Sequence, residues 1–370
     1  MKILQLVSCR GWSSDAYWAA RVTRELERRG HAVTLGCRRG TDRAVIDRAR
    51  AEGVARVETF RFAGGLRPGA DLGDLRRLRA AVAATDVVHV HRGKEHWLAA
   101  TAARLAGGRP IVRTRHIVQA VRPHAGNRWL YGRATALVVA VTEAIRGQCL
   151  AAGLLAPDRI VTLPGGADAE AYRPRPVDPG VRRALGAEDD RPLVGLVAGL
   201  RVMKGHRVVL EAVARLAREG VRPHIVFVGR GGMEATLRQA VSRAGLDGQV
   251  TLAGFVPDLP AVMAALDIAL YVPLESEGMS RVVFEYLAAG RPLVAARVGV
   301  VPEVLGDGEH AALVPAGDAG ALAATLAALL DDPARRARLG AAGRRLLVER
   351  FSGARLAAAL EAHYARLAAA

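Results

Sequence analysis

The feature that most constrains the fold is a regular alternation between short apolar segments and longer amphipathic stretches. Each apolar segment has the length of a strand buried on both faces, and helical periodicity follows it. The strands expected in the first half are Ile3–Val7, Ala32–Leu35, Asp86–Val90, Pro110–Arg113 and Ala136–Val141. Those expected in the second half are Leu193–Ala198, His224–Val228, Val250–Ala253, Ile268–Val272 and Leu293–Ala295. Because strands that alternate with helices form parallel sheets covered on both faces, the sequence predicts a doubly wound α/β fold.

The chain length, 370 residues, suits two domains of similar size better than one. A second series of strands opens after the loop Leu163–Asp168, so we expect an N-terminal domain over residues 1–170 and a C-terminal domain over residues 171–350. The proline- and arginine-rich stretch Arg173–Asp190 is the expected link. The alanine-rich residues 351–370 are expected to form a helix that crosses back onto the N-terminal domain.

The sequence gives no sign of export or of a membrane span. No apolar run approaches the roughly 18 residues that a spanning helix needs. The run Ile3–Val7 meets Ser8 at once, so it is interpreted as a first strand and not as a signal peptide. The three cysteines, Cys9, Cys37 and Cys149, lack the spacing of a metal or redox motif. We therefore expect a cytoplasmic protein.

Positive charge is concentrated in the first half of the chain. The formal net charge is +17, and residues 1–170 hold 28 basic and 15 acidic side chains, whereas residues 171–370 hold 25 and 21. This asymmetry indicates an anionic partner for the first half, which could be a membrane surface, a lipid-linked acceptor or nucleic acid. A solvated surface without a partner is the alternative, since nearly all the basic residues are arginine in an alanine- and glycine-rich chain. The cations expected to meet an acceptor or a membrane are Arg113, Arg115, Arg122, Arg128 and Lys94.

A glycine-bounded loop in the second half carries two cations three residues apart. Arg201 and Lys204 lie between Gly199 and Gly205, after an expected strand and before an expected helix. Two cations beside the positive end of a helix suit a diphosphate. A solvated turn with incidental charges is the alternative.

Two glutamates eight residues apart form the second candidate cluster. Glu277 lies in a loop at a helix start and Glu285 within that helix, so the two are about 12 Å apart along the axis if every step is helical. Carboxylates accept hydrogen bonds from paired hydroxyls, so one could meet a sugar and the other a ribose. The diphosphate would then lie at the N–H groups of the four residues Gly278, Met279, Ser280 and Arg281. Helix capping by Glu277 and an ion pair between Glu285 and a nearby arginine are the alternatives.

Three further positions follow expected strands, where ligands bind in doubly wound sheets. Gly231 and Val256 could offer backbone contacts to a nucleotide base, and His116 faces the same edge of its sheet. Gly11 follows the first strand without a G-x-G-x-x-G pattern, which argues against a nicotinamide dehydrogenase. In the histidine-rich stretch His89–Trp97, His89 and His91 share one face of a strand whereas His96 lies beyond a turn. No carboxylate completes a clear ligand set, so no metal site is expected.

Taken together these clusters resemble the family 4 glycosyltransferases (glycosyl transferases group 1). Leu163–Asp168 resembles the family's "PNGVD" loop, and Arg201 with Lys204 resembles its diphosphate-binding pair. Glu277 and Glu285 resemble its E-x7-E signature. The resemblance covers nearly the whole chain and is strongest over residues 163–315. It implies the GT-B fold, in which two Rossmann-like doubly wound domains face each other across a cleft.

The resemblance also implies the chemistry. Arg201 and Lys204 would stabilise the leaving nucleoside diphosphate, Glu277 and His116 would contact the donor sugar, and Glu285 would hold the ribose. The donor would be a nucleoside-diphosphate sugar, UDP- or GDP-linked, with no cofactor and no metal, and the transfer would retain the anomeric configuration. The acceptor would be a saccharide or lipid-linked acceptor in cell-envelope glycan synthesis, at the inner membrane face. One departure is that Ser13-Ser14 stand where the family commonly has paired glycines, so Gly11 would have to take over the close approach to the donor.

Two other classes of function remain as alternatives. A nucleotide-sugar epimerase or phosphorylase could use the same fold, although neither Lys2 nor Lys94 is well placed as a pyridoxal-binding lysine of a phosphorylase. A basic nucleic-acid-binding protein is disfavoured, because aromatic residues make up only 4% of the chain and offer few stacking platforms.

Overall fold

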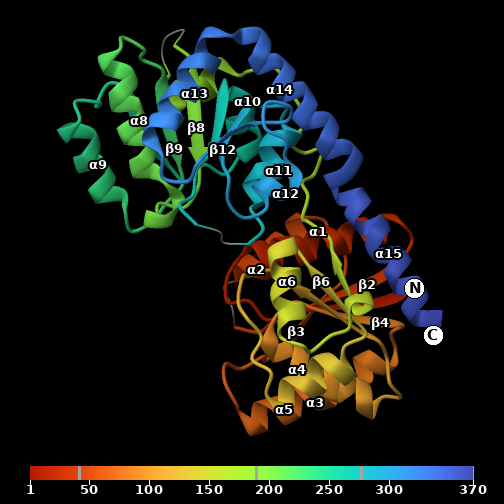
Figure 1. Cartoon of the computed structure of the whole chain (residues 1–370). Coiled ribbons are helices and arrows are strands. Elements are labelled where there is room, and N and C mark those ends of the chain that lie inside the picture. Colours follow the sequence, from red (N-terminus) through yellow and green to blue (C-terminus); the bar gives the residue numbers. More distant parts are fainter. Residues whose placement is uncertain (41–42, 188–190, 276–277, 370) are drawn as a thin grey trace. The chain divides into compact units, whose positions relative to one another are not determined.

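The computed structural model describes residues 1–40, 43–187, 191–275 and 278–369. They divide into two compact units (Figure 1). Unit 1 consists of Met1–Gly165 together with Gly353–Ala370, and unit 2 consists of Gly166–Ser352. Each unit is an α/β sandwich with its own parallel sheet.

Unit 1 is built on a seven-stranded parallel sheet of order β3-β2-β1-β4-β5-β6-β7. Its strands are β1 Lys2–Val7, β2 Ala32–Arg38, β3 Val57–Phe60, β4 Val87–Val90, β5 Ile111–Arg115, β6 Leu137–Ala140 and β7 Ile160–Thr162. Its helices are α1 Ser14–Arg28, α2 Arg43–Ala51, α3 Pro68–Ala83, α4 Gly93–Leu105, α5 Ala125–Trp129, α6 Glu143–Ala151 and α15 Gly353–Ala369, with a π-helical turn at Leu130–Ala134 and a 3₁₀ turn at Pro157–Arg159. The strand order reverses between β1 and β4, which is where doubly wound sheets bind ligands.

Unit 2 contains a six-stranded parallel sheet of order β10-β9-β8-β11-β12-β13. Its strands are β8 Leu193–Val197, β9 His224–Val228, β10 Val250–Gly254, β11 Ile268–Tyr271, β12 Leu293–Ala296 and β13 Ala312–Val314. Its helices are α7 Pro179–Ala184, α8 His206–Arg218, α9 Glu234–Arg243, α10 Leu259–Ala265, α11 Arg281–Ala288, α12 Val301–Val304, α13 Ala319–Asp331 and α14 Pro333–Leu346, with a 3₁₀ turn at Val202–Lys204 and a π-helical turn at Leu347–Phe351.

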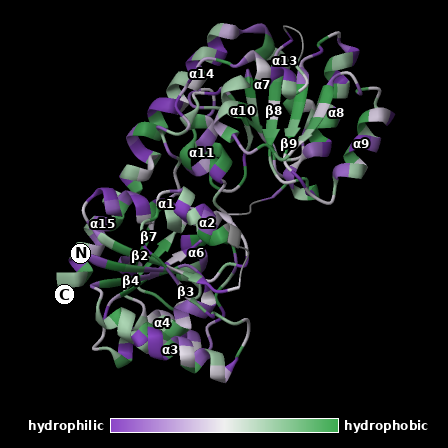
Figure 2. Ribbon diagram, turned by 180° about the vertical axis from the view of Figure 1, so that it is seen from behind, coloured by the Kyte–Doolittle hydropathy of each residue, from purple (hydrophilic) through white to green (hydrophobic). Residues whose placement is uncertain are grey.

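Burial of the strands on both faces explains why the apolar segments lack a period of two. In unit 1, α3 and α4 cover one face of the sheet, while α1 and α15 lie on the other (Figure 1). Figure 2 shows the result, with hydrophobic strands inside each unit and hydrophilic positions on the outer faces of the helices. The two parallel sheets confirm the predicted doubly wound α/β fold. The edge strands β3, β7 and β13 are not predicted from the sequence, because each is only three or four residues long.

The boundaries between the units differ from those expected. The chain passes between the units after Gly165 and again after Ser352, and α15 packs on α1 within unit 1. The expected link, Arg173–Asp190, is not a link: its residues 173–187 belong to unit 2, and residues 188–190 lie outside the described part of the chain. Within it Asp178 caps α7, and α7 packs against α10, so this stretch is part of the second domain.

Candidate active site

The carboxyl edge of the unit 2 sheet is held together by backbone contacts between the loops that follow β8 and β9. The N–H of Leu200 donates to the carbonyl of Arg230 at 3.0 Å, and the N–H of Met233 donates to the carbonyl of Leu200 at 3.2 Å. A Cβ at Gly231 would lie 2.3 Å from the carbonyl oxygen of Leu200. Gly231 was expected to contact the nucleotide-sugar donor. It is also required here for the close approach of these two loops.

The loop that carries the two expected phosphate-binding cations is fixed in the same way. Arg201 precedes the 3₁₀ turn that ends at Lys204, and Gly205 follows with a left-handed φ of 78° before α8 begins. A Cβ at Gly205 would lie 1.8 Å from the carbonyl oxygen of Val272, so no other residue fits there. Arg201 is exposed and Lys204 is half-buried. The fold thus presents both cations on a rigid loop at the amino end of a helix.

The start of α11 lies after β11 at this same sheet edge. Gly278 has a left-handed φ of 91°, and the hydroxyl of Ser280 is hydrogen-bonded to that of Tyr271. Ser280 precedes the first helical residue, yet its side chain makes no capping hydrogen bond. The N–H groups of the first turn therefore have no side-chain cap from this residue, and Met279 and Ser280 are each only 7% exposed.

Glu285 was expected to bind a ribose, yet its carboxylate is deeply buried. Its side chain is 1% exposed, and Oε1 lies 2.9 Å from Nε of Arg281. The same oxygen accepts a hydrogen bond of 3.1 Å from the hydroxyl of Tyr172. Among the described residues, Oε2 of Glu285 has no hydrogen-bond partner. The arginine ion pair that the sequence left open is therefore present, and one carboxylate oxygen remains for a ligand. Glu277, the other expected glutamate, lies outside the described residues.

Val256, which follows β10, is the last residue of unit 2 that was expected to contact the nucleotide-sugar donor. It is half-buried, while its neighbour Phe255 is exposed beneath the guanidinium of Arg230 at 5.7 Å. Unit 2 therefore brings Arg201, Lys204, Gly231 and Val256 to one sheet edge, together with the start of α11.

In unit 1 the corresponding edge carries Gly11 and His116. Gly11 is half-buried in the loop after β1, with open space where a Cβ would lie. His116 follows β5, and its Nε2 lies 3.1 Å from Nδ1 of His91. Burial, against the opposing effect of Asp15 and together with the cations Arg113 and Arg92, lowers the pKa of His116 to about 4. His116 is therefore neutral near pH 7.

An ion pair between a buried aspartate and an exposed arginine, which the sequence did not reveal, borders His116. Asp15, in the first turn of α1, pairs with the guanidinium of Arg92 and accepts a hydrogen bond from the hydroxyl of Ser13. Burial alone would raise the pKa of Asp15, but these hydrogen bonds and the nearby His116 lower it to about 2. Ser13, one of the two serines near the expected place of paired glycines, is thus hydrogen-bonded to Asp15.

The structure corrects two of the five cations expected to meet an acceptor or membrane. Arg113 is only 7% exposed, because its side chain lies in the core of unit 1 near Glu95 and Tyr131. Lys94 is bound to Asp71 at 2.6 Å and to the carbonyl of Gly65 at 2.8 Å, so it joins α4 to the start of α3.

The other three expected cations lie nearer the surface. Arg115 is half-buried and donates to the hydroxyl of Tyr131 at 3.2 Å. Arg122 and Arg128 are exposed. Only these last two present their charge fully to solvent.

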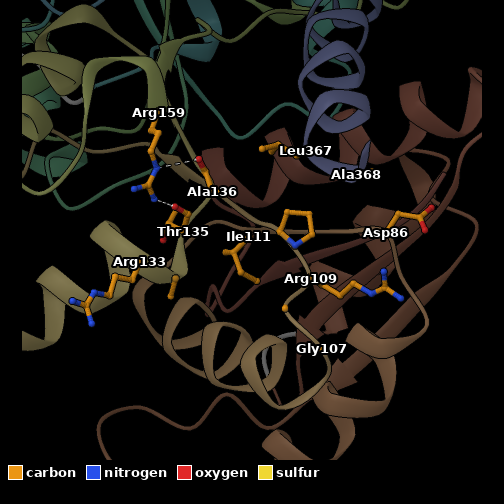
Figure 3. Close-up of a pocket in the computed structure, with 13 residues that line it drawn as sticks. Asp86, Gly107, Arg109, Ile111, Arg133, Thr135, Ala136, Arg159, Leu367 and Ala368 are labelled. Atoms are coloured by element: carbon orange, nitrogen blue, oxygen red, sulfur yellow. Dashed lines mark hydrogen bonds between the residues drawn. The ribbon is translucent and has the colours of Figure 1, made fainter. Parts of the chain in front are cut away.

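A pocket of about 580 Å³ in unit 1 lies at the opposite edge of the sheet (Figure 3). Asp86, Arg109 and Arg159, which line it, each stand just before a strand. The Arg159 guanidinium donates to the carbonyls of Gly132 at 2.7 Å, Tyr131 at 3.1 Å and Ala136 at 3.5 Å, and also to that of Thr135. Because the expected site residues all follow strands, this pocket is separate from them.

The described part of the chain contains neither a candidate metal site nor a candidate membrane span. No group of three or more histidine, cysteine, aspartate and glutamate side chains there could hold a metal ion. No helix among these residues is long and apolar enough to cross a membrane.

Comparison with known proteins agrees with this architecture. The model of glycosyltransferase family 4 matches residues 16–171, and that of glycosyl transferases group 1 matches residues 179–346. The 2-deoxystreptamine glucosyltransferase of Streptomyces kanamyceticus is 32% identical over 66% of this chain, which spans 63% of that enzyme's length. The D-inositol 3-phosphate glycosyltransferase of Xylanimonas cellulosilytica is 32% identical over 76% of this chain and 72% of its own.

A solved structure matches the fold along almost the whole chain. The crystal structure of Anabaena Alr3699/HepE in complex with UDP superposes with a TM-score of 0.84 and 22% identity, covering 99% of this chain and 100% of that one. The family expected from the motifs and the fold expected from the strand pattern are both confirmed. The chain belongs to the glycosyl transferases of group 1 and has the GT-B fold.

Proposed function

We propose that this protein is a retaining glycosyltransferase that moves a hexose from a nucleoside-diphosphate sugar to a hydroxyl of a saccharide or lipid-linked acceptor. The observation that carries the proposal is the rigid loop of Arg201 and Lys204, which stands at the amino end of α8 beside the start of α11. Cations and helix N–H groups at one sheet edge suit a diphosphate leaving group. Similarity to HepE, which was crystallised with UDP, supports a uridine donor, with GDP as the other candidate base.

In the proposed reaction the acceptor oxygen forms a bond to the anomeric carbon as the bond from that carbon to the diphosphate oxygen breaks. The electron pair goes to the diphosphate, which Arg201 and Lys204 stabilise, and a diphosphate oxygen takes the acceptor's proton. Charge stabilisation by two preorganised cations takes the place of a metal ion. Glu285 would hold the ribose through its remaining oxygen, while Glu277 and His116 would contact the donor sugar.

Nucleotide binding tests the donor site directly. We would measure thermal stabilisation by UDP, GDP, ADP and TDP with EDTA present. A hundredfold excess of a ligand over its dissociation constant should stabilise the folded protein by roughly 2.7 kcal/mol. We expect one diphosphate to stabilise the wild type, with the effect lost in Lys204→Ala and Arg201→Ala.

Arg238→Ala is a matched control, because Arg238 is an exposed cation of unit 2 paired with Glu234 on α9. It should respond like the wild type. Equal stabilisation of Lys204→Ala and Arg201→Ala would refute the assignment of the diphosphate site. Donor conversion without any acceptor would favour the epimerase over the transferase.

We further propose that unit 1 meets its acceptor at an anionic membrane surface, on the inner face of the cell membrane. Apolar side chains are exposed around its carboxyl edge: Leu66 is 85% exposed, Ile117 56% and Trp97 38%. The exposed cations Arg122 and Arg128 lie on the loop and helix that follow β5. Exposed tryptophan and aliphatic groups beside arginines are suited to a lipid interface.

Vesicle binding would separate this surface from general basicity. Arg122→Gln combined with Arg128→Gln should reduce co-sedimentation with phosphatidylglycerol-containing vesicles and leave the weak binding to phosphatidylcholine vesicles unchanged. The control is Arg109→Gln with Arg133→Gln, which removes the same charge from the opposite edge of the unit 1 sheet. Equal losses in both pairs would show that the positive charge acts without a specific surface.

A further inference from the structure

The core of unit 1 contains a cluster of histidines that its packing alone does not explain. His89 lies on β4, His91 directly follows that strand, and His116 follows β5. The rings of His89 and His91 stack at 4.6 Å, and Trp18 of α1 lies edge-on to all three at 5.2 to 5.6 Å. Three imidazoles around one indole place six ring nitrogens close together, and each buried one needs a hydrogen-bond partner.

Hydrogen bonds divide the cluster into two independent groups. His89 uses both nitrogens away from the others: Nδ1 lies 2.5 Å from the hydroxyl of Tyr364 and Nε2 lies 2.6 Å from that of Thr114. His91 instead joins Gln5 to His116. Its Nε2 lies 2.9 Å from Oε1 of Gln5, and its Nδ1 lies 3.1 Å from Nε2 of His116.

The chain from Gln5 to His116 has a direction because the imidazoles are neutral. Burial lowers the pKa of His91 well below its usual range, as do the neighbouring histidines and the cations Arg113 and Arg92. A neutral imidazole carries one N–H, and a carbonyl oxygen can only accept. Oε1 of Gln5 therefore requires the proton of His91 on Nε2, which leaves Nδ1 of His91 to accept from Nε2 of His116. Nδ1 of His116 then carries a lone pair, and no described residue is its hydrogen-bond partner.

We propose that Gln5 and His91 are positioning residues, which hold His116 with its proton on Nε2 so that Nδ1 accepts a hydrogen bond from a hydroxyl of the donor's sugar. The origin of that hydroxyl, a donor sugar, rests on the proposed function. The tautomer of His116 does not depend on it. A site preorganised as an acceptor favours a donor whose sugar carries a free hydroxyl at this point over its deoxy or fluoro analogue.

The tautomer can be measured without substrate. In protein labelled with ¹⁵N-histidine, two-bond nitrogen–proton correlations distinguish Nε2–H from Nδ1–H rings, and single substitutions assign the signals. We expect His91 and His116 both as Nε2–H at pH 7.5. Observation of His116 as Nδ1–H would overturn the proposal, whatever the enzyme's substrates prove to be.

Kinetics then tests the role in positioning. His91→Phe keeps an aromatic ring but removes both nitrogens. Turnover would be followed as nucleotide release from whichever of UDP-glucose and GDP-mannose the wild type uses. We expect kcat to fall about tenfold or more, which corresponds to about 1.4 kcal/mol, while the dissociation constant of the nucleoside diphosphate stays unchanged. His91→Asn retains an amide oxygen near the position of Nδ1 and should restore most of the loss.

His89→Phe is the matched control, because it removes two hydrogen bonds from the same layer without touching the chain to His116. Its kcat should stay within about twofold of wild type. Equal losses in His91→Phe and His89→Phe, with no rescue by His91→Asn, would show a purely structural role and overturn the proposal. Absence of turnover and of nucleotide binding in the wild type would instead refute the proposed function. The tautomer measurement would still show whether Gln5 and His91 hold the proton of His116 on Nε2.

Discussion

Acidification should destabilise unit 1 more strongly than unit 2, because unit 1 buries more histidines whose pKa is lowered. Burial lowers the pKa of four of them: that of His116 falls to about 4, and those of His89, His91 and His96 fall well below the usual 6.5. In the unfolded chain these groups take up protons as the pH falls below about 6.5, whereas in the folded unit they stay neutral. The stability that they provide is therefore fully present above pH 6.5 and is lost as the pH falls towards the folded pKa values.

The slope of the unfolding free energy against pH follows from the number of protons that the unfolded state binds and the folded state does not. One histidine that is protonated only in the unfolded state costs about 1.4 kcal/mol per pH unit. Four such groups would cost about 5 to 6 kcal/mol per pH unit at the steepest point. Glu95 opposes them, since its burial raises its pKa and the folded state binds that proton first. The net slope near pH 5 is then about 4 kcal/mol per pH unit, so one to two pH units would remove about 4 to 8 kcal/mol of a typical stability of roughly 5 to 15 kcal/mol.

Tryptophan fluorescence provides a probe of this unit alone. The chain has four tryptophans, and all of them, Trp12, Trp18, Trp97 and Trp129, lie in unit 1. We would record urea unfolding by fluorescence between pH 7.5 and 5.0 and expect the midpoint to fall steeply below pH 6.5. His96→Gln, which can keep the bond to Thr135, should lower the slope by about 1.4 kcal/mol per pH unit. A midpoint that is constant down to pH 5.0 would refute the reasoning.

Three further outcomes are expected. Gly205→Ala should abolish stabilisation by the nucleotide and destabilise unit 2 by more than the ~1–2 kcal/mol of left-handed strain alone. Gly245→Ala, at a φ of 66° with open space around it, should show only that strain. Equal destabilisation by the two substitutions in calorimetry would contradict the close approach of Gly205 to Val272. Arg159→Met should lower the urea stability of unit 1 by about 2 kcal/mol through the loss of its carbonyl partners, and Arg133→Met, an exposed neighbour, should change it little. Treatment with EDTA followed by gel filtration should leave nucleotide affinity unchanged, and restoration of lost affinity by Mg²⁺ or Mn²⁺ would contradict metal-independent binding.

The sequence by itself determined the features that depend on neighbouring residues. Apolar segments such as Leu193–Val197 predict buried parallel strands, because a strand covered on both faces needs no polar side. The loop of Arg201, Lys204 and Gly205 can also be predicted from the sequence, because its cations, its turn glycine and the following helix are neighbours along the chain. These local signals sufficed for the fold class and the family, and the proposed position of the diphosphate site along the chain rests on them.

Only the tertiary structure decided which side chains are buried and which distant ones meet. Arg113 and Arg122 look alike in the sequence, yet one lies in the core and the other in solvent, because sheets covered on both faces leave no alternation that marks an exposed position. His91 meets Gln5, which is 86 residues away in the chain, and His116, which is 25 away. Strand order brings them together, with β4 between β1 and β5, and that order is set by packing over the whole unit and not by any local pattern.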